Sequence, residues 1–438
     1  MPQVKIKERD RTQTPVGEYA NFAVAVPGVL GFDDQGNACT GIYEDGTSVF
    51  DDNGIYECSS QADFIKYIGY HQGVSVDVEE SESEEEEESE TPTELVQIGN
   101  QIAYELLGLG YPVLYKKFET LSELNNWDFW EPLTDKANYD FRFVISGLFT
   151  NSDTAAEQID KVVHRNDPET GEDTAPGRGD AAALLDIDET VYNTSSNRAN
   201  RSKLFEDIRD AANDLIAGKY SAIFAPSVCL LGTSSKYTNT KFPASFYYLA
   251  CFKNALDNGF AEWYAAAGYT RGVCKYTIEA ADVNFGEYFV NQLEPRNNAN
   301  NLTKAVNVIT KIRNNYYLWG NRTAFALGEE LKASHFLNIR QLCSTIKKQL
   351  YYACKRFTFD PNSDVLWINF CNAIAPTLEK MKADQGIKDY KIVKVYTAKK
   401  AELKAKIRII PIEAVEDFDL EISLEDNFGN ALVTTIEK

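Results

Sequence analysis

The sequence has 438 residues, of which 44% are hydrophobic and 12% aromatic. This is enough for roughly two or three domains with large buried cores. Lys and Arg number 44 and Asp and Glu number 66, so the formal net charge is −22. This charge argues against a protein whose main task is to bind the phosphate backbone of nucleic acids.

Histidine and cysteine usage predicts no metal site and no cofactor. The three histidines are scattered along the chain, and the eight cysteines form no C-x-x-C pair and no zinc-like spacing. The first nine residues lack the apolar segment of a signal peptide. The longest apolar stretches, 22–32 and 220–232, are too short to span a bilayer. We therefore expect a chain of a reducing cytosol that does not insert into a membrane.

The sharpest change in composition is the acidic tract Glu79–Glu90, in which nine of twelve residues are Glu. Such a run repels itself and has no apolar surface to bury, so we expect a mobile, solvated loop. A docking tract for a basic partner is the alternative interpretation.

Secondary structure before and after the tract is marked by hydrophobic periodicity. A strand is predicted at Phe22–Val26 and a short helix at Ala62–Ile68, preceded by serines that can cap it. After the tract, leucines and isoleucines at helical spacing predict a helix over Leu95–Leu107, and Pro112–Tyr115 leads into a strand.

The middle of the chain predicts a strand–helix–strand unit. Ala181–Ile187 and Tyr220–Ala225 are continuous apolar runs, as in strands buried on both faces, and a helix over Leu204–Ile216 joins them. This connection implies a parallel strand pair and an α/β core. Four further helices are predicted, and Pro376 should bend or split the last of them. They span Ser245–Asn258, Leu302–Tyr317, His335–Phe357 and Asp364–Asp384.

Both ends of the chain alternate apolar and charged residues, as strands with one buried face do. Near the N-terminus, Val4 and Ile6 alternate with lysines. Near the C-terminus, the apolar positions alternate with acidic or polar ones; they are Phe418, Leu420, Ile422 and Leu424. These segments could extend the sheet of their own subunit, or they could be donated to another subunit. We expect the six apolar residues to lie in contacts between subunits.

One segment matches an enzyme signature. The apolar strand that ends in Asp186-Ile187-Asp188-Glu189-Thr190 has the D-x-D-x-T pattern of haloacid-dehalogenase-like phosphatases. There the first Asp is the phosphoryl-accepting nucleophile, the second is the acid/base, and Mg²⁺ neutralises the gathered charge. The downstream acidic elements that would complete a metal site are absent from the sequence, so we treat this function as an alternative only.

A basic stripe is predicted on the helix His335–Phe357. The apolar residues share one face of this helix, and the basic residues gather on roughly the opposite face. In an acidic chain such a stripe is a plausible contact surface, with an ordinary solvated helix face as the alternative. The four residues are Arg340, Lys347, Lys348 and Lys355.

Taken in order, these segments resemble the tail sheath proteins of contractile phages, pyocins and type VI secretion-like machines. The C-terminal third carries most of the resemblance. Trp319–Thr323 resembles the family's W-G-x-R-T element, and Leu337–Leu342 its next helix, although Gln341 stands where the family usually has Arg. Phe357–Asn362 with Leu366-Trp367 resembles its F-x-P-N turn and helix, and Lys406–Pro411 its closing strand.

The resemblance continues upstream more loosely. Pro243–Asp257 and Ala265–Gly272 are similar to a proline- and glycine-containing region of the family, with Ala266 in place of the usual Pro. Arg178-Gly179-Asp180 before the strand Ala181–Ile187 is similar to the family's R-x-D lead-in to an apolar strand that ends in Asp. This similarity offers a structural explanation for the D-x-D pattern.

The resemblance implies a structural protein without catalytic residues, assembled in the host bacterial cytoplasm and then part of the virion. It implies stacked six-fold rings around an inner tail tube, with the baseplate and tail terminator as further partners. Contraction would drive the tube through the host envelope without nucleotide hydrolysis. The four basic residues could then face the tube or an acidic neighbour, and the acidic tract should point away from the lumen. Another tail protein, such as a tube, baseplate or terminator subunit, is the remaining alternative.

The expected fold is mixed α/β and α+β, with a central parallel βαβ core, a C-terminal α+β domain and extended terminal arms. We expect an N-terminal arm over residues 1–18 and an α/β region over 19–318 that contains a mobile acidic loop at 77–93. A C-terminal domain should follow over 319–425, and a C-terminal arm over 426–438.

Overall fold

A computed structural model describes residues 22–414 of the chain, apart from several internal segments. The segments not described are 34, 70–92, 147–152, 165–176, 189–190, 192–200, 227–228, 232–240, 276, 281–303, 314, 325–331, 397–400 and 413. The acidic tract and the six terminal apolar residues expected in subunit contacts therefore lie outside the described residues.

An eight-stranded sheet forms the body of the molecule, in the order β11-β10-β6-β5-β4-β1-β3-β2. Its inner strands pair in parallel, and β2 and β11 pair antiparallel at the two edges. The strands are β1 (Val24–Gly28), β2 (Ile55–Cys58), β3 (Val113–Lys117), β4 (Phe143–Ile145), β5 (Ala182–Asp186), β6 (Ser221–Ala225), β10 (Val306–Ile312) and β11 (Asn315–Trp319). This confirms the predicted parallel pair and the mixed α/β class.

Helices cover both faces of the body sheet, which gives three layers. On one face lie α1 (Gln61–Tyr67), α2 (Thr93–Gly108) and α8 (Ala244–Asp257). The other face carries α4 (Asp153–Val163), α7 (Arg201–Asp214) and a group of short helices. The short helices within the described residues are η1 (Leu121–Asn125), α3 (Trp127–Trp130), η2 (Glu131–Thr134), α9 (Gly268–Arg271) and η4 (Ala333–His335).

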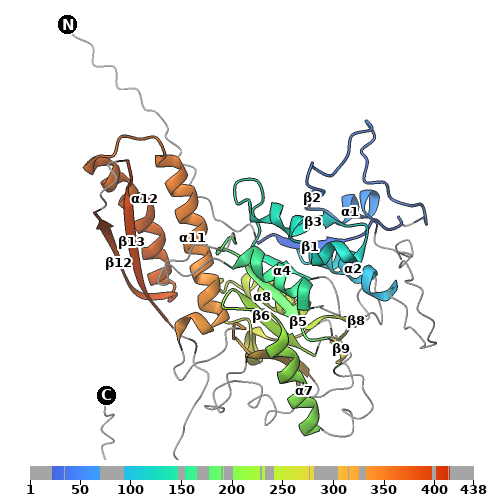
Figure 1. Ribbon diagram of the computed structural model, residues 1–438. Coiled ribbons are helices and arrows are strands. Elements are labelled where there is room, and N and C mark those ends of the chain that lie inside the picture. The colour runs from blue at the N-terminus through green and yellow to red at the C-terminus, as the bar shows by residue number, and fades with distance from the viewer. Residues whose placement is uncertain are drawn as a thin grey trace, which may run out of the picture.

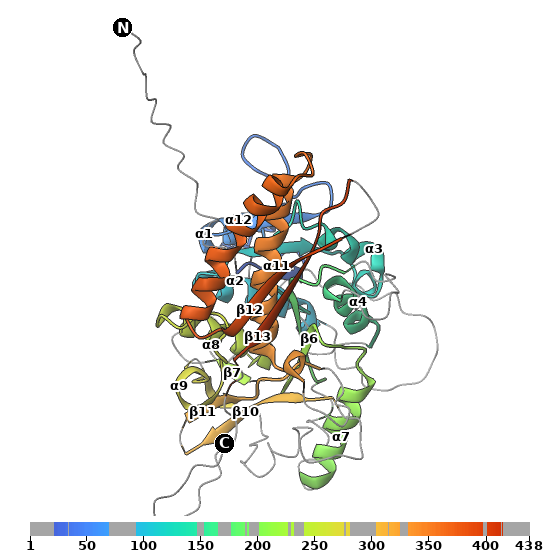
Figure 2. The same cartoon turned by 90° about the vertical axis from the view of Figure 1, so that its left-hand side faces the viewer.

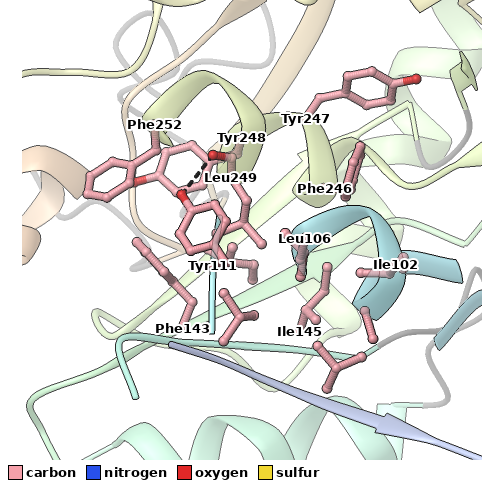
Figure 3. Packing of buried hydrophobic residues seen from close by; sticks show 14 of the residues in the cluster. Ile102, Leu106, Tyr111, Phe143, Ile145, Phe246, Tyr247, Tyr248, Leu249 and Phe252 are labelled. Atoms are coloured by element: carbon pink, nitrogen blue, oxygen red, sulfur yellow. Dashed lines mark hydrogen bonds between the residues drawn. The ribbon is translucent and has the colours of Figure 1, made fainter. Parts of the chain in front are cut away.

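The two faces follow directly from strand alternation. In β1, Val24 and Val26 belong to the core under α2 and α8, whereas Ala25 belongs to the core under α4 and α7. Figure 3 shows the first of these cores, in which aromatic side chains of α8 pack against the sheet and α2. The Tyr111 hydroxyl donates to the Leu249 carbonyl at 2.8 Å, so its polar end is satisfied inside the core.

Close packing of α2 against β1 requires a glycine. A Cβ atom on Gly99 would lie 2.3 Å from the carbonyl oxygen of Pro27. The helix can therefore approach the strand only where the side chain is missing.

The predicted helix Leu302–Tyr317 is wrong, because the described part of this segment forms the hairpin of β10 and β11. Val306, Val308 and Ile312 are β-branched and favour a strand, and β10 joins the sheet in parallel with β6. The apolar spacing also fitted a helix, and only the neighbouring strand decides between the two.

The C-terminal part of the chain forms a separate lobe. It consists of α11 (Leu337–Phe357), α12 (Asp364–Ala383) and an antiparallel ribbon of β12 (Ile387–Val395) and β13 (Lys404–Pro411). Figure 1 shows the lobe at one end of the molecule, and Figure 2 looks onto it. Pro376 lies inside α12, which continues through it without splitting.

A small third sheet, outside the C-terminal lobe, contains β7 (Cys229–Leu231), β8 (Lys241–Phe242) and β9 (Thr277–Ala280).

The lobe begins later than residue 319. Residues 319–324 still belong to the body, since the Ala324 amide donates to the Ser221 carbonyl at 2.7 Å. Arg322 pairs with Phe336 as an isolated bridge, and α11 follows directly. No described helix is both long enough and apolar enough to cross a membrane.

Candidate functional site

The lobe has its own hydrophobic core, which holds the ribbon against the two helices. Leu342 and Ile346 of α11, Phe370 of α12 and Ile387 of β12 are buried in it. Ser363 caps the N-terminus of α12 by accepting from the Leu366 amide. The lobe can therefore act as a unit that carries the ribbon.

Arg142 fastens α11 to the body through hydrogen bonds. This residue directly precedes β4 and is 1% exposed. Its guanidinium donates to the side-chain oxygen of Gln341 at 2.6 Å, to the Gln341 carbonyl at 2.5 Å, and to the Thr345 hydroxyl at 2.7 Å. Burial lowers the pKa of Arg142, and the negative charge of Glu262 opposes this shift most strongly.

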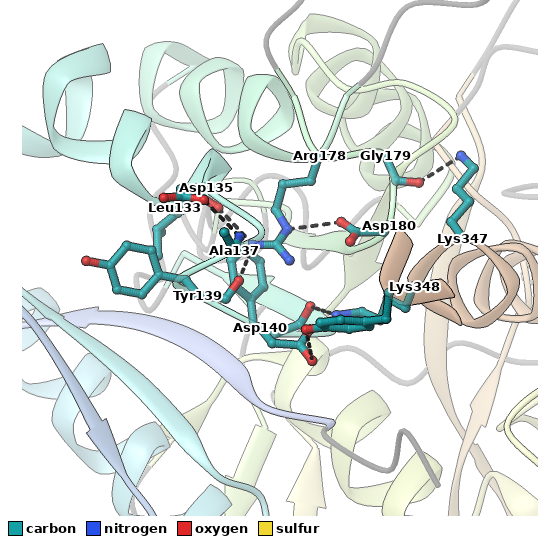
Figure 4. A network of polar contacts seen from close by, with 12 residues as sticks. Leu133, Asp135, Ala137, Tyr139, Asp140, Arg178, Gly179, Asp180, Lys347 and Lys348 are labelled. Atoms are coloured by element: carbon teal, nitrogen blue, oxygen red, sulfur yellow. Dashed lines mark hydrogen bonds and ion pairs between the residues drawn. The ribbon is translucent and has the colours of Figure 1, made fainter. Parts of the chain in front are cut away.

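The basic face of α11 also turns toward the body (Figure 4). Lys348 pairs with Asp140 and donates to the Phe141 carbonyl at 2.8 Å. Lys347 donates to the Gly179 carbonyl at 2.7 Å and to the Tyr220 hydroxyl at 3.1 Å.

This arrangement corrects the expected exposed basic stripe. Arg340 is 7% exposed and lies over the Tyr220 ring at 4.5 Å, and Lys348 is 2% exposed. The physical reason is that a basic helix face can be neutralised by the carboxylates, carbonyls and rings of its own chain. Of the four residues, only Lys355 is exposed, and its contact with a tube stays a prediction.

The R-x-D lead-in has a structural role. Arg178 forms an ion pair with Asp180 at 3.0 Å, and both residues are buried. Arg178 also donates to the carbonyls of Leu133 and Tyr139, at 3.1 and 2.5 Å, and its guanidinium lies 4.2 Å from the centre of the Phe141 ring. Burial alone would raise the pKa of Asp180, but Arg178 and the nearby lysines lower it overall. The pair joins the start of β5 to η2 and to the segment that leads into β4.

Asp186 of the phosphatase-like pattern is fully buried at the end of β5. Its carboxylate accepts from the Ser245 amide at 2.9 Å and from the Ser245 hydroxyl, both in the first turn of α8. Burial raises the pKa of Asp186 to about 7, while these hydrogen bonds oppose the rise. A carboxylate held this way stabilises a helix N-terminus and has no exposed oxygen for attack on a substrate. Among the described residues, no group of three or more His, Cys, Asp or Glu could hold a metal ion.

The ribbon is the feature of the lobe that can bind another chain. Within the described residues, β12 and β13 pair only with each other, so each strand has one free edge. Free edges present unpaired backbone donors and acceptors to an incoming strand. An isolated two-stranded ribbon is also only marginally stable, and further strands would strengthen it.

Sequence reasoning missed β12 and the charge of the ribbon's outer face. The alternation Lys404-Ala-Lys406-Ile-Arg408 is the signal that could have found this face, since it has the period of a strand with one apolar side.

Large apolar side chains are also exposed on the lobe. They are Phe359, Val365, Ile368, Tyr396, Ile410 and Ile412.

No protein-family model and no curated protein matches the sequence. Solved structures do match it over almost its whole length. A chain in the six-fold symmetrised baseplate of the anti-feeding prophage has 14% identity and a TM-score of 0.62, and the match covers 97% of this chain and 99% of that chain.

Two further structures give the same result. A chain of the contracted PVC sheath complex, an extracellular contractile injection system, has 15% identity and a TM-score of 0.57, with 97% and 98% of the two chains covered. The sheath tail protein of Desulfitobacterium hafniense has 9% identity and a TM-score of 0.50, with 94% and 100% covered. The chain therefore has the fold of the sheath proteins of contractile tails and injection systems.

Proposed function

We propose that this protein is the structural subunit of a contractile tail sheath, which polymerises around an inner tube and contracts to drive the tube through a host envelope. The observation that carries the proposal is the end-to-end structural match to chains of sheath and baseplate assemblies. A match over 97% of the chain includes both the body and the lobe, so it is more specific than a shared α/β core.

Assembly would proceed by exchange of terminal strands. The N-terminal residues Val4 and Ile6 and the C-terminal apolar residues Phe418, Leu420, Ile422 and Leu424 are the proposed contacts. The free edges of the ribbon support this, because an added strand gains backbone hydrogen bonds there. Such a contact joins unlike surfaces of two copies and need not close, so it can build stacked rings in a helix.

Contraction fits a lattice of this kind. Subunit bodies can rotate while strand links keep neighbours connected, and the free energy is stored in the interfaces of a kinetically trapped extended state. The inner tube, the baseplate and a terminator are the proposed partners, and the tail of the particle is the proposed location. The similar chain in a baseplate structure supports association with a baseplate.

Negative-stain microscopy of the purified full chain tests the proposal. We expect long hollow tubes of contracted sheath. Globular particles or closed single rings would instead indicate a baseplate or terminator protein, and thin tubes a tube protein.

Deletion of residues 1–10 tests strand donation. We expect monomers with an unchanged circular dichroism spectrum that no longer polymerise. Tubes like those of the full chain would contradict a role of this segment in assembly.

The phosphatase alternative is tested on the purified full chain with a simple phosphoester and Mg²⁺, and activity that is lost in Asp186→Asn would support it.

A further inference from the structure

A cavity lies at the joint between the body and the lobe. Its volume is about 270 Å³, and its walls come from the end of α8 and the segment after it, from α11 and α12, and from Phe22. Most of these walls are apolar, and the large apolar side chains are Phe22, Leu256, Phe260, Trp263 and Met381. All of them except Met381 stay partly exposed, so an apolar group that filled the cavity would remove further apolar surface from water.

One face of α11 carries three polar residues one turn apart, and the last two of them line the cavity. The first, Gln341, accepts from Arg142, and the hydroxyl of the second, Thr345, donates to the carboxylate of Glu262. The third is Gln349, whose side-chain oxygen is buried without a hydrogen-bond partner among the described residues. A buried acceptor without a donor is unfavourable, so the cavity favours a group that carries a hydrogen-bond donor.

The chain enters the body at the wall of this cavity. Phe22 is the first described residue, and its ring centre lies 5.6 Å from that of Phe252 and 5.8 Å from the guanidinium of Arg142. The strand β1 begins two residues later. Residues 1–21, which lie outside the described residues, are therefore tethered to the cavity through Phe22.

Tyr19 has the properties that this cavity requires. It is the only aromatic residue among residues 1–21, and the three residues of backbone that separate it from Phe22 can span up to about 10 Å. An apolar cavity of about 150 Å³ already holds a benzene molecule, so this cavity has room for a phenol ring. A tyrosine hydroxyl can donate or accept, so it can pair with the amide of Gln349 in either orientation of that amide.

The tether favours Tyr19 over an occupant from outside the chain. A side chain of a second copy, or a free apolar molecule, would lose translational and rotational freedom when it entered the cavity. Tyr19 is already held beside the cavity by Phe22, so its effective concentration there is high.

We propose that Tyr19 docks into the cavity between the body and the lobe of its own chain, with its hydroxyl paired to Gln349. The docked ring touches the body and both helices of the lobe, so it stabilises their joint. Residues 1–18 then leave the molecule from a fixed point and can reach up to about 60 Å from it. This inference concerns the single subunit and does not depend on the proposed function.

Limited proteolysis of isolated subunits tests the docking. Chymotrypsin cleaves after tyrosine, and the rate of cleavage after Tyr19 follows the fraction of chains in which this residue is undocked. Thr377 of α12 lines the cavity, and Thr377→Trp should fill it. We expect cleavage after Tyr19 to be about tenfold faster in this variant than in the unmodified chain. Mass spectrometry of the full chain, at a concentration at which it does not polymerise, measures both rates.

The control variant is Asn372→Trp, which adds the same side chain at an exposed position of α12 that does not line the cavity. The folded residues after Tyr19 hinder the protease equally in all variants, so this control should be cleaved at the rate of the unmodified chain. An unchanged rate in Thr377→Trp, with an unchanged circular dichroism spectrum, would overturn docking into this cavity. Protection that increases with the concentration of the chain would overturn the assignment to the same copy.

A double-mutant cycle tests the hydrogen bond without filling the cavity. Tyr19→Phe keeps a cleavage site and removes the hydroxyl, so it should speed cleavage about fivefold, as expected for the loss of one hydrogen bond. In the background of Gln349→Met, which removes the amide and keeps an unbranched side chain, Tyr19→Phe should no longer speed cleavage. Rates are divided by those of free peptides of residues 12–22 that carry the same residue at position 19. The same acceleration by Tyr19→Phe in both backgrounds would contradict the pairing with Gln349.

Discussion

Single buried polar residues in this protein connect distant parts of the chain. Asp186 ties the end of β5 to the start of α8, and Arg142 ties β4 to α11. Gln341, which departs from the sheath pattern, accepts a hydrogen bond from Arg142. Asp186 of the D-x-D pattern and three cations of the basic helix thus serve the fold; the three are Arg340, Lys347 and Lys348.

Substitution Asp186→Asn should remove a pH dependence of stability. Because the pKa of Asp186 is raised from 3.8 to about 7, the folded state keeps its proton where the unfolded chain has lost it. The contribution of Asp186 to stability is therefore fully present below about pH 4 and is lost as the pH rises to about 7, by at most about 1.4 kcal/mol per pH unit. Urea unfolding at several pH values should show that between pH 4 and 7 the free energy of unfolding falls more steeply with pH in the unmodified chain than in Asp186→Asn.

The control for this experiment is Asp188→Asn, which changes the same charge two residues away. It should keep the slope of the unmodified chain between pH 4 and 7. An equal slope in Asp186→Asn would mean that another group carries the pH dependence.

At the scale of elements, the attachment of α11 to the body depends on a few polar contacts. Arg142→Ala should lower the free energy of unfolding by about 3 kcal/mol, since it leaves the buried side-chain oxygen of Gln341 without the Arg142 donor and opens a cavity. Lys355→Ala, on the exposed part of the same helix, should change it by less than about 0.5 kcal/mol. Chemical denaturation measures both, and equal effects would show that the lobe is held by other contacts.

Secondary structure was predicted correctly where the hydrophobic pattern of a segment fitted only one kind of element. The helices α8, α11 and α12 start and end within a few residues of expectation, because long amphipathic or apolar periods combine with clear ends. The segment 302–317 failed because its apolar residues fit a helix as well as two short strands. Pro376 was expected to bend or split α12, and the helix continues through it without splitting.

At the scale of the molecule, charge is unevenly distributed, with a basic lobe and an acidic remainder. Replacing the nine Glu of the tract Glu79–Glu90 by Gln changes the net charge from −22 to −13. Because the tract has no apolar surface to bury, the melting temperature should change by no more than about 2 °C, and tubes should still form. Thermal unfolding and negative-stain microscopy check this, and loss of tubes would favour a docking role for the tract.

The sequence by itself determined the buried strands β1, β3, β5 and β6, the helices α2, α7, α8, α11 and α12, and the order of sheath-like segments, because burial leaves a local period of two or 3.6 residues. Only the tertiary structure decided what the polar residues do. Arg142 and Gln341 are 199 residues apart, and Asp186 and Ser245 are 59 apart. The free edges of the ribbon and the pairing of Lys391 with Arg408 are likewise properties of strand register, which local periodicity does not encode.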